Sequence, residues 1–323
     1  MTDRIRWGIL ATGGIATTIT EDLLLLPDEA EVLAVGSRTL ERAQDFATKH
    51  GIERAYGSYA ELAADADIDV IYVATPHNDH LASTELCLRA GKAVLCEKPL
   101  TVTAAEAERL VTLAREQGTF LMEAYWTRTH PLVRKLAELV ANGAIGEVRH
   151  VSAELAFCFD VDDDHRLLNP DLAGGAILDL GVYPVHIANL VLGEPQRVIG
   201  TGRLAGTGVD ADATALLVHE NATAVVHCSM EASGPSDLHV LGTTGRLHLP
   251  HFLKSEKLIM HRDGADPEEF VQHLPGHGYT LQAQEVMRCL RAGLTESPLV
   301  PLDTTLETMR TLDAWRAALN DGN

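Results

Sequence analysis

The stretch that decides the fold is Ile5-Arg6-Trp7-Gly8-Ile9-Leu10-Ala11-Thr12-Gly13-Gly14-Ile15-Ala16. Its first half is apolar enough for a buried strand, and the glycine-rich turn that follows opens a helix running to Leu26. In a dinucleotide-binding fold, such a turn brings backbone N–H groups and a helix N-terminus against a pyrophosphate. Against the pattern G-x-G-x-x-A, Ala11 replaces the first glycine, while Gly13 and Ala16 fit. The turn predicts a nucleotide site made by Thr12, Gly13, Gly14, Ile15 and Ala16.

Short apolar runs alternate with helical stretches through the first 125 residues. The further strands are predicted at residues 32–36, 70–74, 93–96 and 120–124, and the helices at residues 40–50, 59–64, 80–90 and 104–117. This alternation is typical of βαβ units in a parallel, doubly wound sheet. The sequence therefore predicts an α/β fold whose first domain, residues 1–125, is a Rossmann dinucleotide-binding domain.

The pattern changes after residue 126. Helices are predicted at residues 132–142, 176–192, 281–292 and 306–319, and an alternating strand runs from Val151 to Phe159. Further strands follow without intervening helices, at residues 197–204, 213–219, 223–230, 238–242 and 246–249. We therefore expect residues 126–323 to form an α+β domain with an open, mainly antiparallel sheet, one face of which can receive a substrate or a partner.

Composition excludes several classes of function. The 323 residues include 46 acidic and 26 basic side chains, for a formal charge of −20. This balance argues against nucleic-acid or anionic-membrane partners, which bind clustered Lys and Arg. No run approaches the ~18 apolar residues of a membrane span. The five scattered cysteines form no disulfide framework, so we expect a reducing compartment, the cytoplasm.

The end of the second strand points to one dinucleotide over the other. An NAD-preferring site usually has an acidic residue there for the ribose hydroxyls, but this chain has Ser37 and Arg38, with Arg42 one turn further on. A hydroxyl and a guanidinium suit a 2′-phosphate, whereas a carboxylate would repel it. We expect NADP as the cofactor, with NAD possible; the alternative is that Arg38 is simply solvated at a strand end.

Three further stretches carry a family resemblance: residues 74–80 (Ala-Thr-Pro-His-Asn-Asp-His), residues 97–100 (Glu-Lys-Pro-Leu), and residues 174–184 (Gly-Gly-Ala-Ile-Leu-Asp-Leu-Gly-Val-Tyr-Pro). Together they resemble the Gfo/Idh/MocA oxidoreductases over nearly the whole chain. Tyr183 stands where inositol dehydrogenase-like members have histidine. This chain is therefore similar to the branch that includes dimeric dihydrodiol dehydrogenase and glucose–fructose oxidoreductase.

The resemblance implies which further residues form the site. It places cofactor contacts at Thr75, Pro76, His77, His80, Glu97, Lys98, Trp126 and Arg128, with Glu97 toward the ribose. It places the substrate against Lys98, Phe159, Arg166, Asp179, Tyr183 and His186. It also implies a homodimer or homotetramer, for which the open C-terminal sheet is the expected face.

The residue types suit hydride transfer to or from an alcohol. Asp179, Tyr183 and His186 are spaced to share one helix face, and Pro184 is expected to distort that helix. A phenol with an ordinary pKa of ~10 is a weak base, but a nearby ammonium lowers that pKa. We therefore expect Tyr183 to exchange the proton, Lys98 to lower the Tyr183 pKa and hold the substrate oxygen, and Asp179 to orient both. Two alternatives are a polar helix face that only ties the two domains together, and a purely structural ion pair between Lys98 and Asp179.

No metal is expected, because His77 with His80 and His248 with His251 form H-x-x-H pairs without a third ligand at metal-site spacing.

The leading hypothesis is an NADP-dependent dehydrogenase or reductase for a secondary alcohol of a sugar, polyol or cyclic trans-diol. Two alternatives remain open: a redox-neutral glycosidase that keeps NAD tightly bound, and a non-catalytic NADP sensor. The residues do not specify which small-molecule substrate binds, or the physiological direction.

Overall fold

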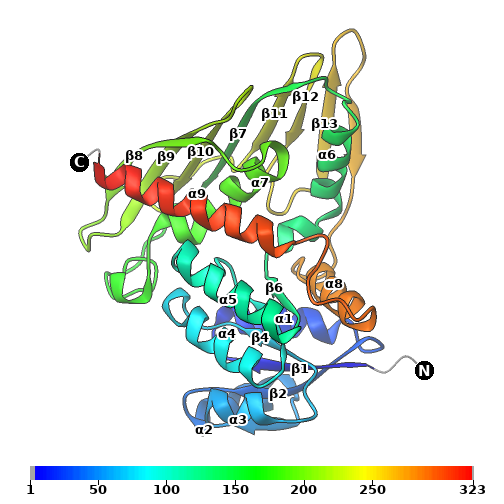
Figure 1. Ribbon diagram of the computed structural model, residues 1–323, viewed down its shortest axis with the longest axis vertical. Helices are drawn as coiled ribbons and strands as arrows, with labels where there is room; N and C mark the ends of the chain where they lie inside the picture. Colours follow the sequence, from blue (N-terminus) through cyan, green and yellow to red (C-terminus); the bar gives the residue numbers. More distant parts are fainter. Residues whose placement is uncertain (1–3, 322–323) are drawn as a thin grey trace. The chain divides into compact units, whose positions relative to one another are not determined.

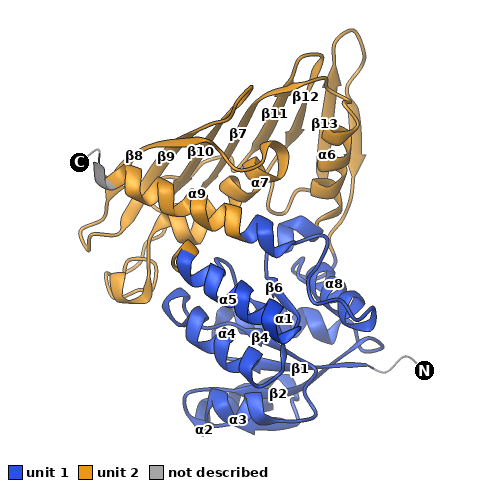
Figure 2. Cartoon of the chain, in the orientation of Figure 1, with its two compact units in different colours: residues 1–101, 105–129, 275–305 blue, residues 102–104, 130–274, 306–323 orange. Residues whose placement is uncertain are grey.

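The computed structural model describes residues 4–321 and divides into two compact units (Figure 2). Unit 1 contains residues 1–101, 105–129 and 275–305, and unit 2 contains residues 102–104, 130–274 and 306–323. The units are discontinuous in sequence, whereas the predicted domains divide once, at residue 125. Residues 275–305 join unit 1 because Asp22 accepts hydrogen bonds from the backbone N–H groups of His277, Tyr279 and Thr280.

Unit 1 contains a six-stranded parallel sheet in the order β3-β2-β1-β4-β5-β6 (Figure 1). Its strands are β1 (Ile5–Leu10), β2 (Ala30–Gly36), β3 (Arg54–Tyr56), β4 (Val70–Val73), β5 (Ala93–Cys96) and β6 (Leu121–Glu123). This order confirms the predicted doubly wound fold, in which ligands bind beyond the carboxyl ends of the strands. The sequence missed β3, a three-residue edge strand that has no apolar run.

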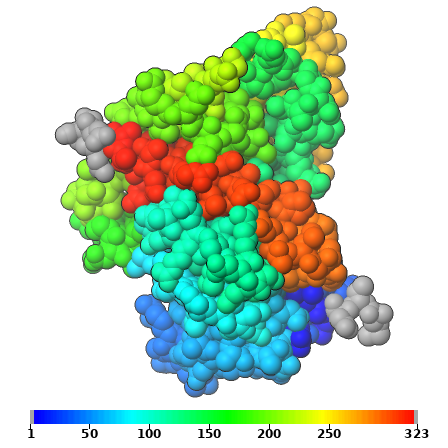
Figure 3. All heavy atoms as spheres, viewed as in Figure 1, coloured from blue at the N-terminus to red at the C-terminus, as the bar shows by residue number. Residues whose placement is uncertain are grey.

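Helices cover the unit 1 sheet: α1 (Gly14–Leu24), α2 (Leu40–His50), α3 (Tyr59–Ala64), α4 (His80–Arg89), α5 (Ala104–Gln117) and α8 (Thr280–Arg291). Glu85 of α4 bonds to Arg109 of α5, which ties these two helices together. Their side chains form a closely packed cyan layer in the space-filling view (Figure 3). The short 3₁₀ helices η1 (His77–Asp79) and η2 (Trp126–Thr129) follow β4 and β6. Both lie at the carboxyl edge of the sheet, where the site is expected.

Unit 2 contains an eight-stranded sheet in the order β14-β13-β12-β11-β7-β10-β9-β8. Its strands are β7 (Val148–Ala156), β8 (Arg197–Leu204), β9 (Asp210–Val218), β10 (Thr223–Ser229), β11 (Leu238–Gly242), β12 (Gly245–Leu249), β13 (Lys257–Arg262) and β14 (Glu268–Val271). Among the described strands of this sheet, only β7 and β10 pair in parallel, which confirms the mainly antiparallel prediction. Strands β13 and β14 were not predicted, because charged residues at their ends hide the short alternation.

One face of the unit 2 sheet is covered by helices, α6 (Pro131–Ala141), α7 (Val182–Leu192) and the part of α9 (Leu302–Asp321) that belongs to this unit. Gly200 and Gly202 of β8 let α9 approach closely, because a Cβ at Gly200 would lie 2.9 Å from Trp315 and one at Gly202 would lie 2.9 Å from Leu319. The helical segment Pro170–Leu192 is long and apolar enough to cross a membrane, yet 83% of its most apolar window is buried. Such burial is typical of a core helix.

Candidate active site

The turn after β1 leaves open space in front of helix α1. A Cβ built at Gly13 or Gly14 would meet no heavy atom within 4 Å, and the φ of Gly13, −79°, suits any residue. Neither crowding nor backbone conformation therefore requires glycine at these two positions. Within residues 4–321, no side chain caps the N-terminus of α1, so its first N–H groups face this space. The arrangement fits a dinucleotide pyrophosphate held by backbone N–H groups.

Ala11, in the tight turn after β1, has a strained backbone conformation. Its φ is +87°, where a Cβ crowds the carbonyl oxygen, at a cost of about 1–2 kcal/mol. A glycine relieves this strain but loses about 0.5–1 kcal/mol through the greater freedom of the unfolded chain. We therefore expect Ala11→Gly to raise the free energy of unfolding by about 0.5–1 kcal/mol, measured by urea unfolding. A fall in stability would show that the Ala11 methyl group makes packing contacts worth more than the strain.

The residues predicted to hold a 2′-phosphate lie at the carboxyl end of β2. Ser37 is buried, and its Oγ lies 3.5 Å from Oγ1 of Thr12, so the ends of β1 and β2 meet at this point. Arg38 and Arg42 are exposed. Burial raises the pKa of Asp79, while a hydrogen bond from Ser83 and the charge of Arg38 oppose that rise. Arg38 therefore lies near the loop after β4 and remains accessible to an anionic ligand.

His80 cross-links two loops that carry several of the predicted cofactor residues. It is fully buried at the start of α4, and its ring nitrogens lie 2.8 Å from the Pro99 carbonyl oxygen and 2.9 Å from the Thr75 carbonyl oxygen. Carbonyl oxygens only accept hydrogen bonds, so a ring nitrogen that carries a proton donates to the carbonyl oxygen it faces. His80 thus positions the loop that contains Lys98. Neighbouring His77 is also buried, and its ring meets that of His80 edge-on at 5.6 Å.

Glu97 is fixed by groups on both sides. One carboxylate oxygen accepts from the Tyr72 hydroxyl, and the other accepts from the Lys98 backbone N–H at 3.2 Å. Burial raises the pKa of Tyr72 well above its ordinary value, and the charge of Glu97 adds to that rise. Tyr72 therefore stays protonated and remains a donor. This pair holds the backbone at the start of the Lys98 turn, and Lys98 itself is half-buried beyond the carboxyl end of β5.

Glu123 is a buried carboxyl group that the sequence prediction missed. It lies at the carboxyl end of β6, where its oxygens accept from the Leu100 N–H at 3.0 Å and the Thr305 hydroxyl at 2.8 Å. Burial raises its pKa to about 7; the two hydrogen bonds oppose that rise, Glu97 adds to it and Lys98 opposes it. The sequence feature that could have identified Glu123 is its position as the single carboxylate in the otherwise apolar stretch Phe120–Ala124.

Trp126 and Arg128 lie in η2, directly after β6. The Trp126 ring is buried against the ring of Tyr279, with centroids 5.2 Å apart. Arg128 donates through Nε to the Leu299 carbonyl oxygen at 2.8 Å. Both side chains therefore contact the returning segment 275–305 of unit 1. Their predicted role as cofactor contacts remains a prediction.

In unit 2, a widened helical turn carries Asp179. A π-helix, Ile177–Gly181, precedes α7, and Pro184 in the first turn of α7 cannot donate a helical hydrogen bond. This is the distortion expected beside Tyr183. Asp179 is buried and accepts from Arg166, whose guanidinium lies 3.0 Å away and is half-exposed. The predicted substrate residues Arg166 and Asp179 are thus joined to each other.

The pair Gly174-Gly175 explains how Arg166 reaches Asp179. A Cβ at Gly174 would lie 2.6–2.9 Å from the carbonyl oxygens of residues 166, 167 and 169, so only glycine lets this loop fold onto itself. Gly175 has a φ of +125°, and a Cβ there would lie 2.5 Å from the Asp210 carboxylate. Asp210 in turn accepts from the Ile177 N–H and anchors the π-helix.

The other predicted substrate residues occupy two environments. Tyr183 and His186 are buried in α7, and Nδ1 of His186 lies 3.3 Å from the Thr308 hydroxyl of α9. Phe159, by contrast, is 39% exposed in the loop after β7, where its ring lies 6.0 Å from that of Phe157. The acidic residues of the same loop, at positions 160 and 162–164, are exposed.

Two family models match the chain. Residues 5–125 match the oxidoreductase family with an NAD-binding Rossmann fold, and residues 133–248 match the GFO/IDH/MocA C-terminal domain. The mouse trans-1,2-dihydrobenzene-1,2-diol dehydrogenase is 39% identical over 331 residues, which cover 98% of this chain and 97% of that protein.

Solved structures show the same fold over the whole chain. A 3-ketoreductase from Actinomadura kijaniata, in complex with NADP and TDP-benzene, is 31% identical, with a TM-score of 0.86 and 98% of each chain covered. The aldose-aldose oxidoreductase from Caulobacter crescentus is 25% identical, with a TM-score of 0.89 and 99% of each chain covered.

Together with the family match and the dehydrogenase relatives, the parallel sheet with its open helix N-terminus identifies an NAD(P)-dependent oxidoreductase. The chain belongs to the GFO/IDH/MocA family. It is a dehydrogenase for a small-molecule substrate, and its unit 1 is an NAD(P)-binding Rossmann domain.

Proposed function

We propose that this chain transfers hydride between NADP and a secondary alcohol or ketone, with cyclic trans-diols and sugars as substrate classes. The similarity to trans-dihydrodiol dehydrogenases over 98% of the chain carries this proposal. The Actinomadura reductase binds NADP, and the Caulobacter enzyme is named for aldoses, which supports both parts of it. NADP supplies the hydride acceptor or donor when it is bound.

We further propose roles for the polar residues. The N–H groups at the start of α1 hold the pyrophosphate, and Ser37, Arg38 and Arg42 hold the 2′-phosphate. Tyr183 exchanges the hydroxyl proton, Lys98 stabilises the phenolate and holds the substrate oxygen, and Asp179 orients these groups. Arg166 fixes the position of the Asp179 carboxylate by donating a hydrogen bond to it. His80, Tyr72 and Glu97 position the Lys98 loop through their contacts with its neighbours.

A substrate panel tests the reaction class. Sugars, inositols and cyclic trans-diols are each incubated with NADP and with NAD, and the absorbance of the reduced cofactor is followed. We expect turnover with NADP on at least one secondary alcohol, and Lys98→Met serves as the blank. Product formation without net cofactor reduction would instead identify a redox-neutral reaction, and cofactor binding without any turnover would identify a sensor.

Arg38→Ala tests the choice of cofactor. The exposed guanidinium gives a charge-assisted contact to a 2′-phosphate, and such a contact contributes about 1.5–3 kcal/mol. We expect the variant to lose about 10–100-fold in kcat/KM with NADP and little with NAD, measured at saturating substrate. Arg42→Ala should give a smaller loss in the same direction. Equal efficiency with both cofactors in the unaltered protein, unaffected by Arg38→Ala, would contradict NADP preference.

We propose that the open face of the unit 2 sheet pairs with another copy in a homodimer or homotetramer. Ile199 of β8, Leu216 of β9 and Val225 of β10 lie side by side on this face, because the three strands pair in that register. All three side chains are apolar and partly exposed to solvent. Light scattering should give two or four times the chain mass of 34.9 kDa, and Leu216→Glu should lower it. A monomeric mass would contradict the proposal.

The free cysteines, four of them buried, support a cytoplasmic location.

A further inference from the structure

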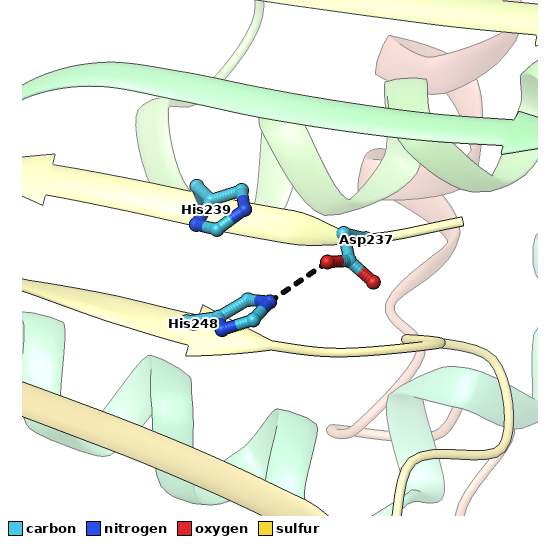
Figure 4. Close-up of side chains that lie close together, drawn as sticks. All are labelled: Asp237, His239 and His248. Carbon is cyan, nitrogen blue, oxygen red and sulfur yellow. Dashed lines mark hydrogen bonds and ion pairs between the residues drawn. The ribbon is translucent and has the colours of Figure 1, made fainter. Parts of the chain in front are cut away.

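Three potential metal ligands meet on the open face of the unit 2 sheet, at the hairpin formed by β11 and β12. Asp237 precedes β11, His239 lies in β11, and His248 lies directly opposite His239 in β12. Their ligand atoms all lie within 4.8 Å of one another (Figure 4). From these positions we propose that Asp237, His239 and His248 bind one divalent transition-metal ion of the zinc class.

The alternation of the hairpin turns both histidines to the same face. Leu238, Val240, Leu247 and Leu249 are fully buried on the helix-covered face, so the residues between them point to the open face. The two imidazole rings stack there at 4.2 Å between centroids and 12° between planes. Because two antiparallel strands hold them in direct register, the rings are brought together before any ion binds.

The hydrogen-bonded atoms of Asp237 and His248 are nearly as far apart as two ligand atoms of one metal ion. Oδ2 of Asp237 lies 2.9 Å from Nε2 of His248. In a tetrahedral site the ligands lie about 2.0–2.1 Å from zinc, and therefore about 3.3 Å from each other. An ion can replace the shared proton after a shift of a few tenths of an ångström. The ring of His239 then completes the set by a side-chain rotation.

The other contacts of the cluster favour this use. Oδ1 of Asp237 accepts from the His251 backbone N–H at 3.0 Å, which orients the carboxylate while leaving Oδ2 for an ion. Within residues 4–319, no group hydrogen-bonds to the ring of His239. In the single chain the side chains of His248 and Asp237 are 24% and 21% exposed, so an ion and a water ligand can enter from solvent where another copy does not cover this part of the sheet.

The ligand set specifies the class of metal. Two imidazoles and one carboxylate suit zinc, cobalt, nickel and copper, whereas magnesium and calcium prefer an all-oxygen set. Three protein ligands leave one position for water. The H-x-x-H pair His248 and His251 contributes only one ring, and the remaining ligands come from the neighbouring strand. Spacing along the sequence could not identify such a site.

Binding of zinc chloride to the purified, tag-free full chain tests the proposal. Equilibrium dialysis with metal analysis should find one tightly bound zinc per chain, no comparable binding of magnesium, and a raised unfolding temperature with zinc. Cobalt should give the intense visible absorption of a four-coordinate site with nitrogen ligands. Absence of tight zinc binding to the folded chain would overturn the proposal.

Two variants locate the ion. His239→Asn removes a ligand that has no hydrogen-bond partner, and His248→Gln removes a ligand while its amide can still donate to Asp237. Each should weaken zinc binding at least about 100-fold and abolish the cobalt absorption. His150→Asn is the matched control, because His150 lies on the same face and contacts Thr223 rather than a carboxylate. Unchanged zinc affinity in both cluster variants would place the ion elsewhere and overturn the assignment. Far-ultraviolet circular dichroism verifies that each variant is folded.

Discussion

Tyr183→Phe is expected to lower kcat about 10²–10⁴-fold while leaving NADPH binding nearly unchanged, because it removes only the hydroxyl that we propose exchanges the proton. Lys98→Met is expected to lower kcat at least about 10³-fold, because it removes the positive charge that, in the proposed mechanism, stabilises both the phenolate and the substrate oxygen. Single-turnover measurements of the reduced cofactor give the rate of the chemical step. Fluorescence titration of NADPH gives its affinity.

Matched controls separate chemistry from folding in this pair. Tyr56→Phe removes a phenol that binds Asp65 at the edge strand β3, and Lys135→Met removes an exposed ammonium that pairs with Glu138 in α6. Both should retain normal turnover. If Tyr183→Phe keeps near-normal turnover while Lys98→Met loses it, the lysine performs the proton exchange. If both keep normal turnover, the proposed roles are wrong.

The sequence predicted most of the fold because each element carried its own periodicity. The βαβ alternation specified the parallel sheet of unit 1, and strands β8 and β11 were predicted at the bounds the structure shows. The elements that were missed lack that local signal. Strand β3 is the edge strand next to β2 in the unit 1 sheet. Strands β13 and β14 lie at one edge of the unit 2 sheet and begin with the charged residues Lys257 and Glu268. Tertiary pairing, rather than local pattern, makes these segments strands.

The residue types of the candidate site were predictable, but their connections were not. Polar residues at the ends of apolar strands, such as Ser37 and Glu97, are visible in the sequence. The partners of His80 are backbone carbonyl oxygens, which every residue possesses, so no sequence pattern identifies them. Asp210, which anchors the π-helix, is 33 residues from Ile177 and looks like any strand residue. Contacts of this kind depend on how the chain returns to itself.

Glu123→Gln is expected to change how stability depends on pH. The pKa of Glu123 is raised to about 7 in the folded protein, from an ordinary value of 4.5, because burial disfavours the charged form. The folded state therefore holds a proton that the unfolded state releases, and this stabilisation is lost as pH rises from about 4.5 to about 7. The loss is up to about 3 kcal/mol. Glutamine mimics the protonated acid, since its oxygen accepts from Leu100 and its amide donates to Thr305.

The free energy of unfolding, from urea titrations at pH values from about 5 to about 8, measures this effect. The stability of Glu123→Gln relative to the unaltered protein should rise across that range by up to about 3 kcal/mol. Glu285→Gln is the matched control. Glu285 is also buried, yet hydrogen bonds from Arg288, Ser297 and Cys289 outweigh that burial and hold its pKa below 4.5. Its contribution is lost only as pH falls through that lower pKa, so its variant should show a constant difference from pH 5 to 8. A constant difference for Glu123→Gln as well would mean that Glu123 is ionised throughout, held by Lys98 and its two hydrogen-bond donors.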